Sequence, residues 1–346
     1  MKLGLSLLST YRGALMGVAI IWVMLHHLTY PDIPILKHVM EIGYGGVDIF
    51  LFLSGFGLYF SLSKSVGVIY LPNIAKYYKK RFCRILPEYW LFLLVLFFIQ
   101  IDFGLRSVCT LICEASTIGY WIPEAPYKLW YMSCIVVFYA IFPIYFKLFK
   151  KHGLKVSIGF IVGGFLLALF YLVIMAFCFD NENYGELLSR SISRVPIFFI
   201  GALVGHYAKD SKEFVMTNKG KVVNLILFML SMAAVFYLQN IWSHALRYLP
   251  FMFITPTLCM ILAWLFDKLP HTVSSIFTKI GSISLELYMC HVAVYYDMGL
   301  RYAITNSWGA YVGIPMVFAL SFLAAIILYY INKHVLQPVC GRMLKL

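Results

Sequence analysis

The stretch that decides the fold lies near the start of the chain, where residues 13–27 read GALMGVAIIWVMLHH. This stretch opens the first of a series of runs of 18 or more mostly apolar residues, each long enough to cross roughly 30 Å of hydrocarbon as a helix, that recur along the whole chain. The composition agrees, because 62% of the 346 residues are hydrophobic and only 12% are charged, unlike a soluble globular domain. We therefore predict an all-α, polytopic integral membrane bundle of ten helices. The predicted spans are residues 13–30, 43–63, 85–101, 128–149, 155–178, 190–207, 222–241, 248–267, 276–298 and 308–335.

The domain organisation is simple. No internal repeat, low-complexity stretch or long linker divides the chain, so we expect a single transmembrane domain over residues 1–346. Residues 107–121 are too short and too polar for a confident span, and we expect a surface or re-entrant segment there. The first span lacks a small-residue cleavage site and is too long for a signal peptide, which predicts that it stays in the protein.

The distribution of basic residues predicts the orientation. With both termini cytoplasmic, 21 of the 28 Lys and Arg residues fall to cytoplasmic segments and 7 to outer ones, as the positive-inside rule requires. The net charge of +13 therefore indicates topology and contact with anionic lipid head groups, and it does not call for nucleic acid as a partner. The eight cysteines are scattered and indicate neither a disulfide framework nor a metal site. For Cys109 and Cys113 we leave a pairing on the outer segment open.

Three stretches carry motifs in a fixed order. Residues 11–27, YRGALMGVAIIWVMLHH, open with Arg and Gly and end in His. Residues 43–60, GYGGVDIFLFLSGFGLYF, contain Gly-Val-Asp and Ser-Gly-Phe, and residues 79–90, KKRFCRILPEYW, contain R-x-x-R followed by Pro and Trp. Together, and over nearly the whole chain, they resemble the acyltransferase 3 family of membrane-bound O-acyltransferases. Weaker matches are residues 128–143, KLWYMSCIVVFYAIFP, and residues 281–294, GSISLELYMCHVAV.

The first motif departs from the family pattern in its spacing. The family has Arg directly before the Gly of the apolar run; when Gly17 takes that Gly position, Met16 stands where the Arg is expected and His27 takes the histidine position. Arg12 is four residues earlier, on the same helix face. The resemblance therefore implies a catalytic role for Arg12 and for His27 ahead of His26, with a structural histidine as the alternative.

The chemistry of an O-acyltransferase suits these residues. Such an enzyme deprotonates a hydroxyl as it attacks a thioester carbonyl, and histidine, with an unperturbed pKa of about 6.5, is a suitable general base. We assign that role to His27. Asp48, near the outer end of the second span, could orient its imidazole; helix capping or pairing with a structural arginine is the alternative. Ser54 could carry the acyl group, although a Ser-Gly pair in a membrane helix more often permits close packing.

A basic cluster is the candidate donor site. Lys80, Arg81 and Arg84 lie at a predicted cytoplasmic membrane surface, and guanidinium and ammonium groups bind the phosphates that acyl-CoA carries. Contact with anionic lipids is an equally good explanation of these charges. Glu286, His291 and Trp130 are candidates for an acceptor site or for support of the catalytic groups. Structural pairing of the first two and an interfacial aromatic belt containing Trp130 are the alternatives.

We therefore expect a multi-pass acyltransferase of the plasma membrane, in the bacterial inner membrane. It would move an acyl group, with acetyl the first expectation, from acyl-CoA to a hydroxyl of a cell-envelope glycan or lipid-linked sugar. Acyl-CoA would be a substrate, with no permanently bound cofactor and no metal. The alternative function is a transporter or flippase of a lipid-linked sugar, because charges inside the membrane also mark transport pathways.

Overall fold

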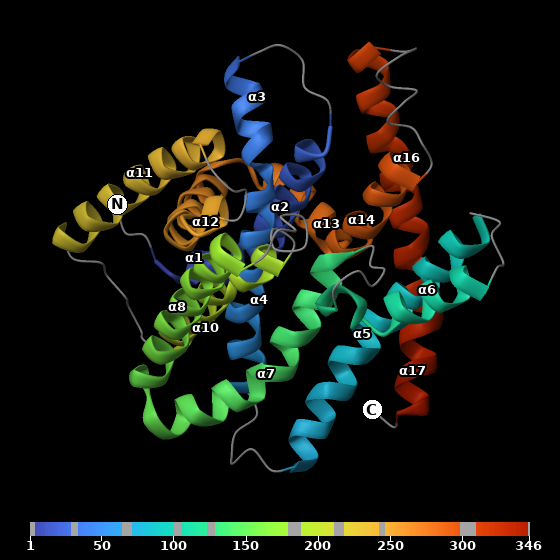
Figure 1. Cartoon of the computed structure of the whole chain (residues 1–346), viewed down its shortest axis with the longest axis horizontal. Coiled ribbons are helices and arrows are strands. Elements are labelled where there is room, and N and C mark those ends of the chain that lie inside the picture. Colours follow the sequence, from blue (N-terminus) through green and yellow to red (C-terminus); the bar gives the residue numbers. More distant parts are fainter. Residues whose placement is uncertain are drawn as a thin grey trace. The chain divides into compact units, whose positions relative to one another are not determined.

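The computed structural model describes residues 4–28, 34–63, 71–99, 105–122, 129–178, 188–210, 218–241, 246–297 and 309–344. Within these ranges all regular structure is helical, as the composition predicted (Figure 1). Seven of the helices there are long and apolar enough to cross a membrane, and two shorter apolar helices lie at residues 12–26 and 222–238. The chain is therefore a multi-pass membrane protein. It divides into two compact units, residues 1–19, 44–67 and 141–282, and residues 20–43, 68–140 and 283–346.

The first unit is centred on helix α4, whose residues are mostly buried. Helix α10 packs against α4 through Gly55 and Gly201. A Cβ atom at Gly201 would lie 2.0 Å from the carbonyl oxygen of Phe52, and one at Gly55 would lie 2.1 Å from that of Phe198. Only glycine fits so close an approach of two backbones, so Gly55 of the second motif serves helix packing. The elements of this unit are α1 (Ser6–Thr10), the first part of α2 (Arg12–His26), α4 (Gly46–Ser63), the end of α7 (Trp130–His152), α8 (Leu154–Cys178), α10 (Val195–Asp210), α11 (Asn218–Ile241), η3 (Leu246–Tyr248), α12 (Phe251–Lys268) and α13 (His271–Ser282).

The second unit brings the end of α2 together with segments from the middle and the end of the chain. Its buried residues include a cluster of Leu28, Val294, Tyr295 and Val317. Helix α14 packs against α16, and α6 packs against α5, where Tyr89 donates a hydrogen bond to the carbonyl of Glu114. The elements are the end of α2, α3 (Pro34–Glu41), η1 (Ile42–Gly45, shared with the first unit), α5 (Leu71–Ile99), α6 (Leu105–Ala115), η2 (Gly119–Trp121), the start of α7, α14 (Ser284–Val292), the π-helical η4 (Ala293–Asp297), α16 (Gly309–Ile331), the π-helical η5 (Asn332–Leu336) and α17 (Gln337–Met343).

Several helices differ from the predicted spans. Helix α5 begins at Leu71, so the basic cluster expected in a loop lies on a helix. The ninth span, predicted over 276–298, is broken between α13 and α14 at Ile283, whose φ and ψ are −112° and 20°. Gly281 and Ser282 precede the break, and both are weaker helix formers than Ala or Leu. The segment 107–121 includes most of the eleven-residue α6, which is too short to span the hydrocarbon.

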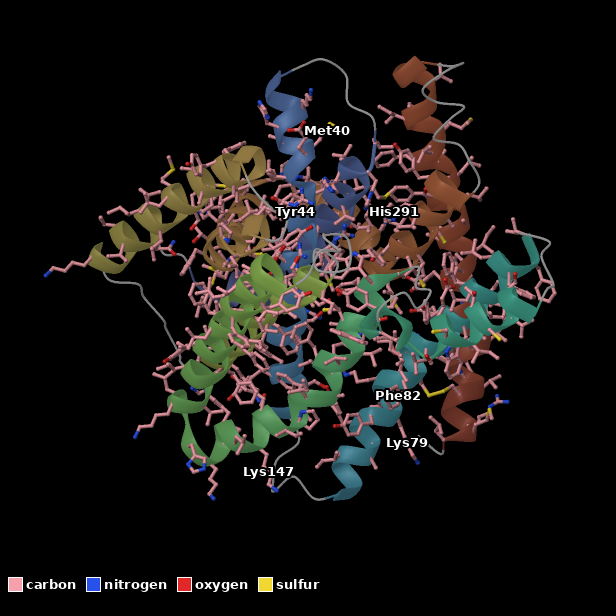
Figure 2. The ribbon with its side chains drawn as sticks, in the orientation of Figure 1. Met40, Tyr44, Lys79, Phe82, Lys147 and His291 are labelled. Atoms are coloured by element: carbon pink, nitrogen blue, oxygen red, sulfur yellow. A yellow bond between two sulfur atoms is a disulfide. The ribbon has the colours of Figure 1, made fainter. Side chains whose placement is uncertain are left out.

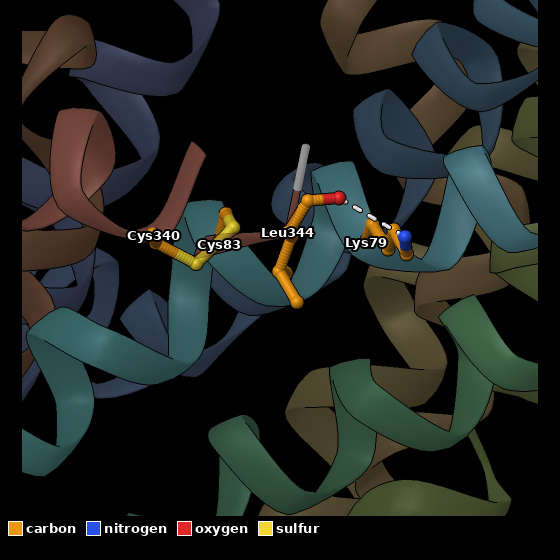
Figure 3. The surroundings of a disulfide bond; sticks show 4 residues. All are labelled: Lys79, Cys83, Cys340 and Leu344. Atoms are coloured by element: carbon orange, nitrogen blue, oxygen red, sulfur yellow. Dashed lines mark hydrogen bonds between the residues drawn. A yellow bond between two sulfur atoms is a disulfide. The ribbon is translucent and has the colours of Figure 1, made fainter. Parts of the chain in front are cut away.

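One disulfide corrects the prediction from the cysteine pattern. Cys83 on α5 is bonded to Cys340 on α17, and the ammonium of Lys79 donates a hydrogen bond to the carbonyl of Leu344 beside it (Figure 3). The two cysteines are 257 residues apart, so no local sequence pattern could have revealed the pair. Cys109 and Cys113, for which a pairing was left open, are free thiols.

Candidate active site

The two histidines of the first motif point to different neighbours within the second unit. Helix α2 ends at His26, and His27 is the next residue. The Nδ1 of His26 lies 3.3 Å from the carbonyl oxygen of Met40 on α3, and its ring is in edge contact with that of His27. The ring of His27 instead lies against that of His291, with ring centroids 5.3 Å apart. His26 thus contacts α3 and His27, whereas His27 contacts both His26 and His291.

His291 comes from the C-terminal part of α14, where Figure 2 labels it. It is 2% exposed, and its Nδ1 lies 2.8 Å from the carbonyl oxygen of Leu287, one turn earlier on the same helix. Two residues beyond His291 the α-helix becomes the π-helical segment η4. Such π-helical insertions are frequent at functional sites because they re-aim side chains.

A narrow cleft lies beside the two rings. It is lined by His27, His291 and Tyr295 with four apolar side chains, and its unfilled space is too narrow to hold a water molecule. The apolar side chains are those of Met24, Leu28, Val317 and Phe318.

Ring contacts lead from this cleft to the candidate acceptor residue Trp130. The ring of Tyr288 lies 5.8 Å from that of His291 and 5.2 Å from that of Tyr131, and Tyr131 in turn contacts Trp130. All four residues belong to the second unit. Two aromatic residues at the start of α7 are therefore connected to His291 through the ring of Tyr288.

The structure gives Glu286 a partner that sequence reasoning missed. Glu286 and Glu88 on α5 are hydrogen-bonded to each other, and the amide of Asn332 donates to Glu88. All three side chains are buried. Glu88 follows Pro87 inside a predicted span, so the cost of a buried carboxylate was the signal that could have found it.

The basic cluster lies on the first half of α5. The guanidinium of Arg81 lies over the rings of Tyr77 and Tyr139, 5.6 and 5.7 Å from their centroids. Such cation–π contacts hold the side chain in place. Lys80 and Arg84 are exposed, and Arg84 also interacts electrostatically with Glu88.

Asp48 is a candidate residue that belongs to the first unit. Asp48 is buried on α4, and Arg194 binds it with Nε at 3.1 Å and Nη2 at 3.0 Å. Arg194 also donates to the carbonyl oxygens of Tyr44 and Arg190, and its guanidinium lies 4.5 Å from the ring centroid of Tyr248. This is the alternative left open from the sequence, an aspartate paired with a structural arginine. A role of Asp48 toward His27 stays a prediction.

Arg12 and Ser54 also belong to the first unit. The Nε of Arg12 donates to the carbonyl of Leu53 at 3.2 Å, and its guanidinium fills the space beside Gly57, where a Cβ atom would come within 2.7 Å of it. Ser54 is buried on α4. Within the described residues, no group of three or more His, Cys, Asp or Glu side chains is placed to hold a metal ion.

Fold and site define an integral membrane protein with two histidines beside a small cleft. Residues 14–331 match the acyltransferase domain family known as acyltransferase 3, and the chain belongs to this family. It is therefore a membrane acyltransferase. A similar curated protein is "Regulator of hypoxia-inducible factor 1" of Caenorhabditis elegans, 20% identical in an alignment that covers 90% of this chain and 76% of that protein. No solved structure gives a significant match.

Proposed function

We propose that the chain transfers an acyl group, acetyl in the first instance, from acyl-CoA to a hydroxyl of a cell-envelope glycan or lipid-linked sugar. His27 is the general base of this reaction. The observation that carries the proposal is the position of the His27 ring, beside His291 and on the wall of the narrow cleft. We propose the bacterial inner membrane as the location, with the basic segments on the cytoplasmic side.

The position of His27 at the end of α2 supports its role as a base. The C-terminal end of a helix carries a partial negative charge from its unpaired carbonyl groups. This charge stabilises the imidazolium that forms when the ring accepts a proton, typically by about 0.3–1 kcal/mol. His26 is the last helical residue, and the contact of its ring nitrogen with Met40 directs it toward α3.

The proposed reaction is a direct transfer. The acceptor hydroxyl oxygen attacks the thioester carbonyl carbon, a C–O bond forms, and the C–S bond breaks. His27 takes the proton from the hydroxyl as the oxygen attacks, and the proton then passes to the leaving CoA thiolate, so the products are an ester and free CoA. Ser54 is buried on a helix that packs closely through the adjacent Gly55, which supports a mechanism without an acyl-enzyme.

The donor would be anchored through its phosphates at the first half of α5. Lys80 and Arg84 are exposed there, and Arg81 is held by two tyrosine rings. Arg and Lys side chains in such a cluster bind phosphate through charge-assisted hydrogen bonds. Binding of anionic lipid at the same residues is compatible with this proposal, because both ligands present phosphate.

The test is mass spectrometry of envelope glycans from the native host with and without the gene, complemented by the wild type and by His27→Ala. We expect a loss of one acyl mass per modified unit in the deletion strain, restored by the wild type and not by His27→Ala. Disappearance of the whole glycan from the surface would instead support the transporter alternative. Unchanged acylation in the deletion strain would overturn the proposal.

A further inference from the structure

His291 has a buried ring nitrogen, Nε2, for which the described part of the chain offers no hydrogen-bond partner. An unsatisfied buried polar atom is costly, and in native proteins it often marks a functional position. The same side chain lines the cleft beside His27. The ring that carries this atom therefore lies beside the proposed base.

The tautomer of His291 follows from its other nitrogen. Nδ1 lies 2.8 Å from the carbonyl oxygen of Leu287, and a carbonyl can only accept, so Nδ1 carries the hydrogen. A neutral imidazole has one N–H, which leaves a lone pair on Nε2. A charged ring at 2% exposure would need a paired anion, so the neutral form is favoured. The atom facing a ligand is then a hydrogen-bond acceptor, and it selects a donor.

One hydroxyl cannot satisfy both histidines. The attacking hydroxyl has a single proton, and the proposed reaction gives that proton to His27. The donor to His291 must therefore be a second group of the same substrate. Hydroxyl groups on adjacent carbons suit this, because their oxygens lie about one hydrogen-bond length, roughly 2.8 Å, apart. The ring centroids of the two histidines are 5.3 Å apart, which two such oxygens can bridge.

We propose that His291 binds the acceptor through Nε2, and that the acceptor is a vicinal diol whose second hydroxyl donates to this atom while the first is acylated at His27. The inference rests on the proposed function and narrows its substrate class. It also requires a side chain of the cleft to move, because the unfilled space is narrow. Met24 and Leu28 are flexible apolar side chains on that wall.

The first experiment compares His291→Gln with His291→Asn in the purified full-length protein. The donor is radiolabelled acetyl-CoA, and the acceptor source is a glycan and lipid extract of the native host lacking the gene. A glutamine can place its side-chain oxygen near the position of Nε2, whereas the shorter asparagine cannot. His38→Asn on α3 is the matched control, because His38 is exposed and outside the cleft.

We expect His291→Asn to raise the apparent KM for the extract about tenfold, the effect of losing one hydrogen bond, with the KM for acetyl-CoA unchanged. His291→Gln should restore the acceptor KM, and His38→Asn should match the wild type. The inference is overturned if Gln and Asn lower kcat equally with both KM values unchanged, or if neither has any effect. A wild-type enzyme that transfers no label at all refutes the proposed function instead.

Two further measurements do not depend on the variants. Mild periodate cleaves vicinal diols, so we expect oxidised and quenched extract to lose its capacity as an acceptor, while extract given pre-quenched periodate keeps it. Full capacity after oxidation would overturn the diol. In 15N-histidine-labelled protein, with the His291 signal assigned by its loss in His291→Gln, Nδ1 should be protonated and Nε2 not. A protonated Nε2 would overturn the inference whatever the activity.

Discussion

The substitution Asp48→Asn separates two roles for a buried carboxylate. Within the first unit, Asp48 and Arg194 are each 1% exposed, and two nitrogens of Arg194 lie 3.0 and 3.1 Å from the same carboxylate oxygen. Arg194 also donates hydrogen bonds to the carbonyl groups of Arg190 and Tyr44, which are neutral acceptors. An asparagine in place of Asp48 would keep one oxygen for the guanidinium but lose the charge that compensates it.

The magnitude follows from the charge left behind. Removing one partner of a buried ion pair typically costs about 3–5 kcal/mol, because the other charge remains buried and unpaired. Since the amide oxygen still accepts a hydrogen bond, we expect the lower end for Asp48→Asn, about 3 kcal/mol, and the upper end for Asp48→Ala. The substitution should lower the free energy of unfolding, and it should affect the rate of acyl transfer per folded molecule much less.

The assay is thermal unfolding of purified protein in detergent, paired with acyl transfer normalised to the monodisperse fraction. Asp267→Asn is the matched control, because Asp267 is an exposed acid in the same unit and should tolerate the change within about 0.5 kcal/mol. The reasoning is refuted if Asp48→Asn unfolds like the wild type while transfer falls a hundredfold. That result would instead support the predicted orientation of the His27 imidazole by Asp48.

Three further predictions test other parts of the account. In the folded double variant Arg81→Ala/Arg84→Ala the KM for acyl-CoA should rise at least tenfold with kcat little changed, because contacts to the phosphates bind the substrate and the transition state equally well. A collapse of kcat at an unchanged KM would contradict the assignment of these residues to donor binding. Cys83→Ser and Cys340→Ser should each destabilise by about 2–4 kcal/mol, and the double variant by no more than either single one, since all three break the same bond; additive losses in thermal unfolding would contradict the pairing. A cysteine placed at Lys151 should resist a membrane-impermeant thiol reagent in intact cells, and strong labelling from outside would contradict the predicted topology.

Hydrophobic runs made the helical membrane fold predictable, because a helix that crosses the hydrocarbon core must be mostly apolar over its whole length. The motif order predicted the family in the same way. Helix interruptions were harder to see, as the break at Ile283 shows, since the apolar run continues through it. A count of basic residues also cannot distinguish Arg194, whose side chain is buried against Asp48, from a basic residue at the membrane surface.

The sequence predicted individual site residues, but it did not predict which of them lie in contact. His27 and His291 were both selected as costly polar groups in spans, but their contact joins segments more than 260 positions apart and has no local signature. The pairing of Glu88 with Glu286 and the bond between Cys83 and Cys340 are long-range contacts of the same kind. Tertiary packing decides such pairs, and a single sequence does not record it.

The most direct test of the central claim is acyl transfer by His27→Ala and His26→Ala, purified as monodisperse protein and compared with the wild type. Removing a general base typically costs a hundredfold or more, so His27→Ala should lose acyl transfer by about that factor while still folding. His26 contacts α3 through Met40, so His26→Ala should keep substantial activity. Full activity in His27→Ala would contradict the account.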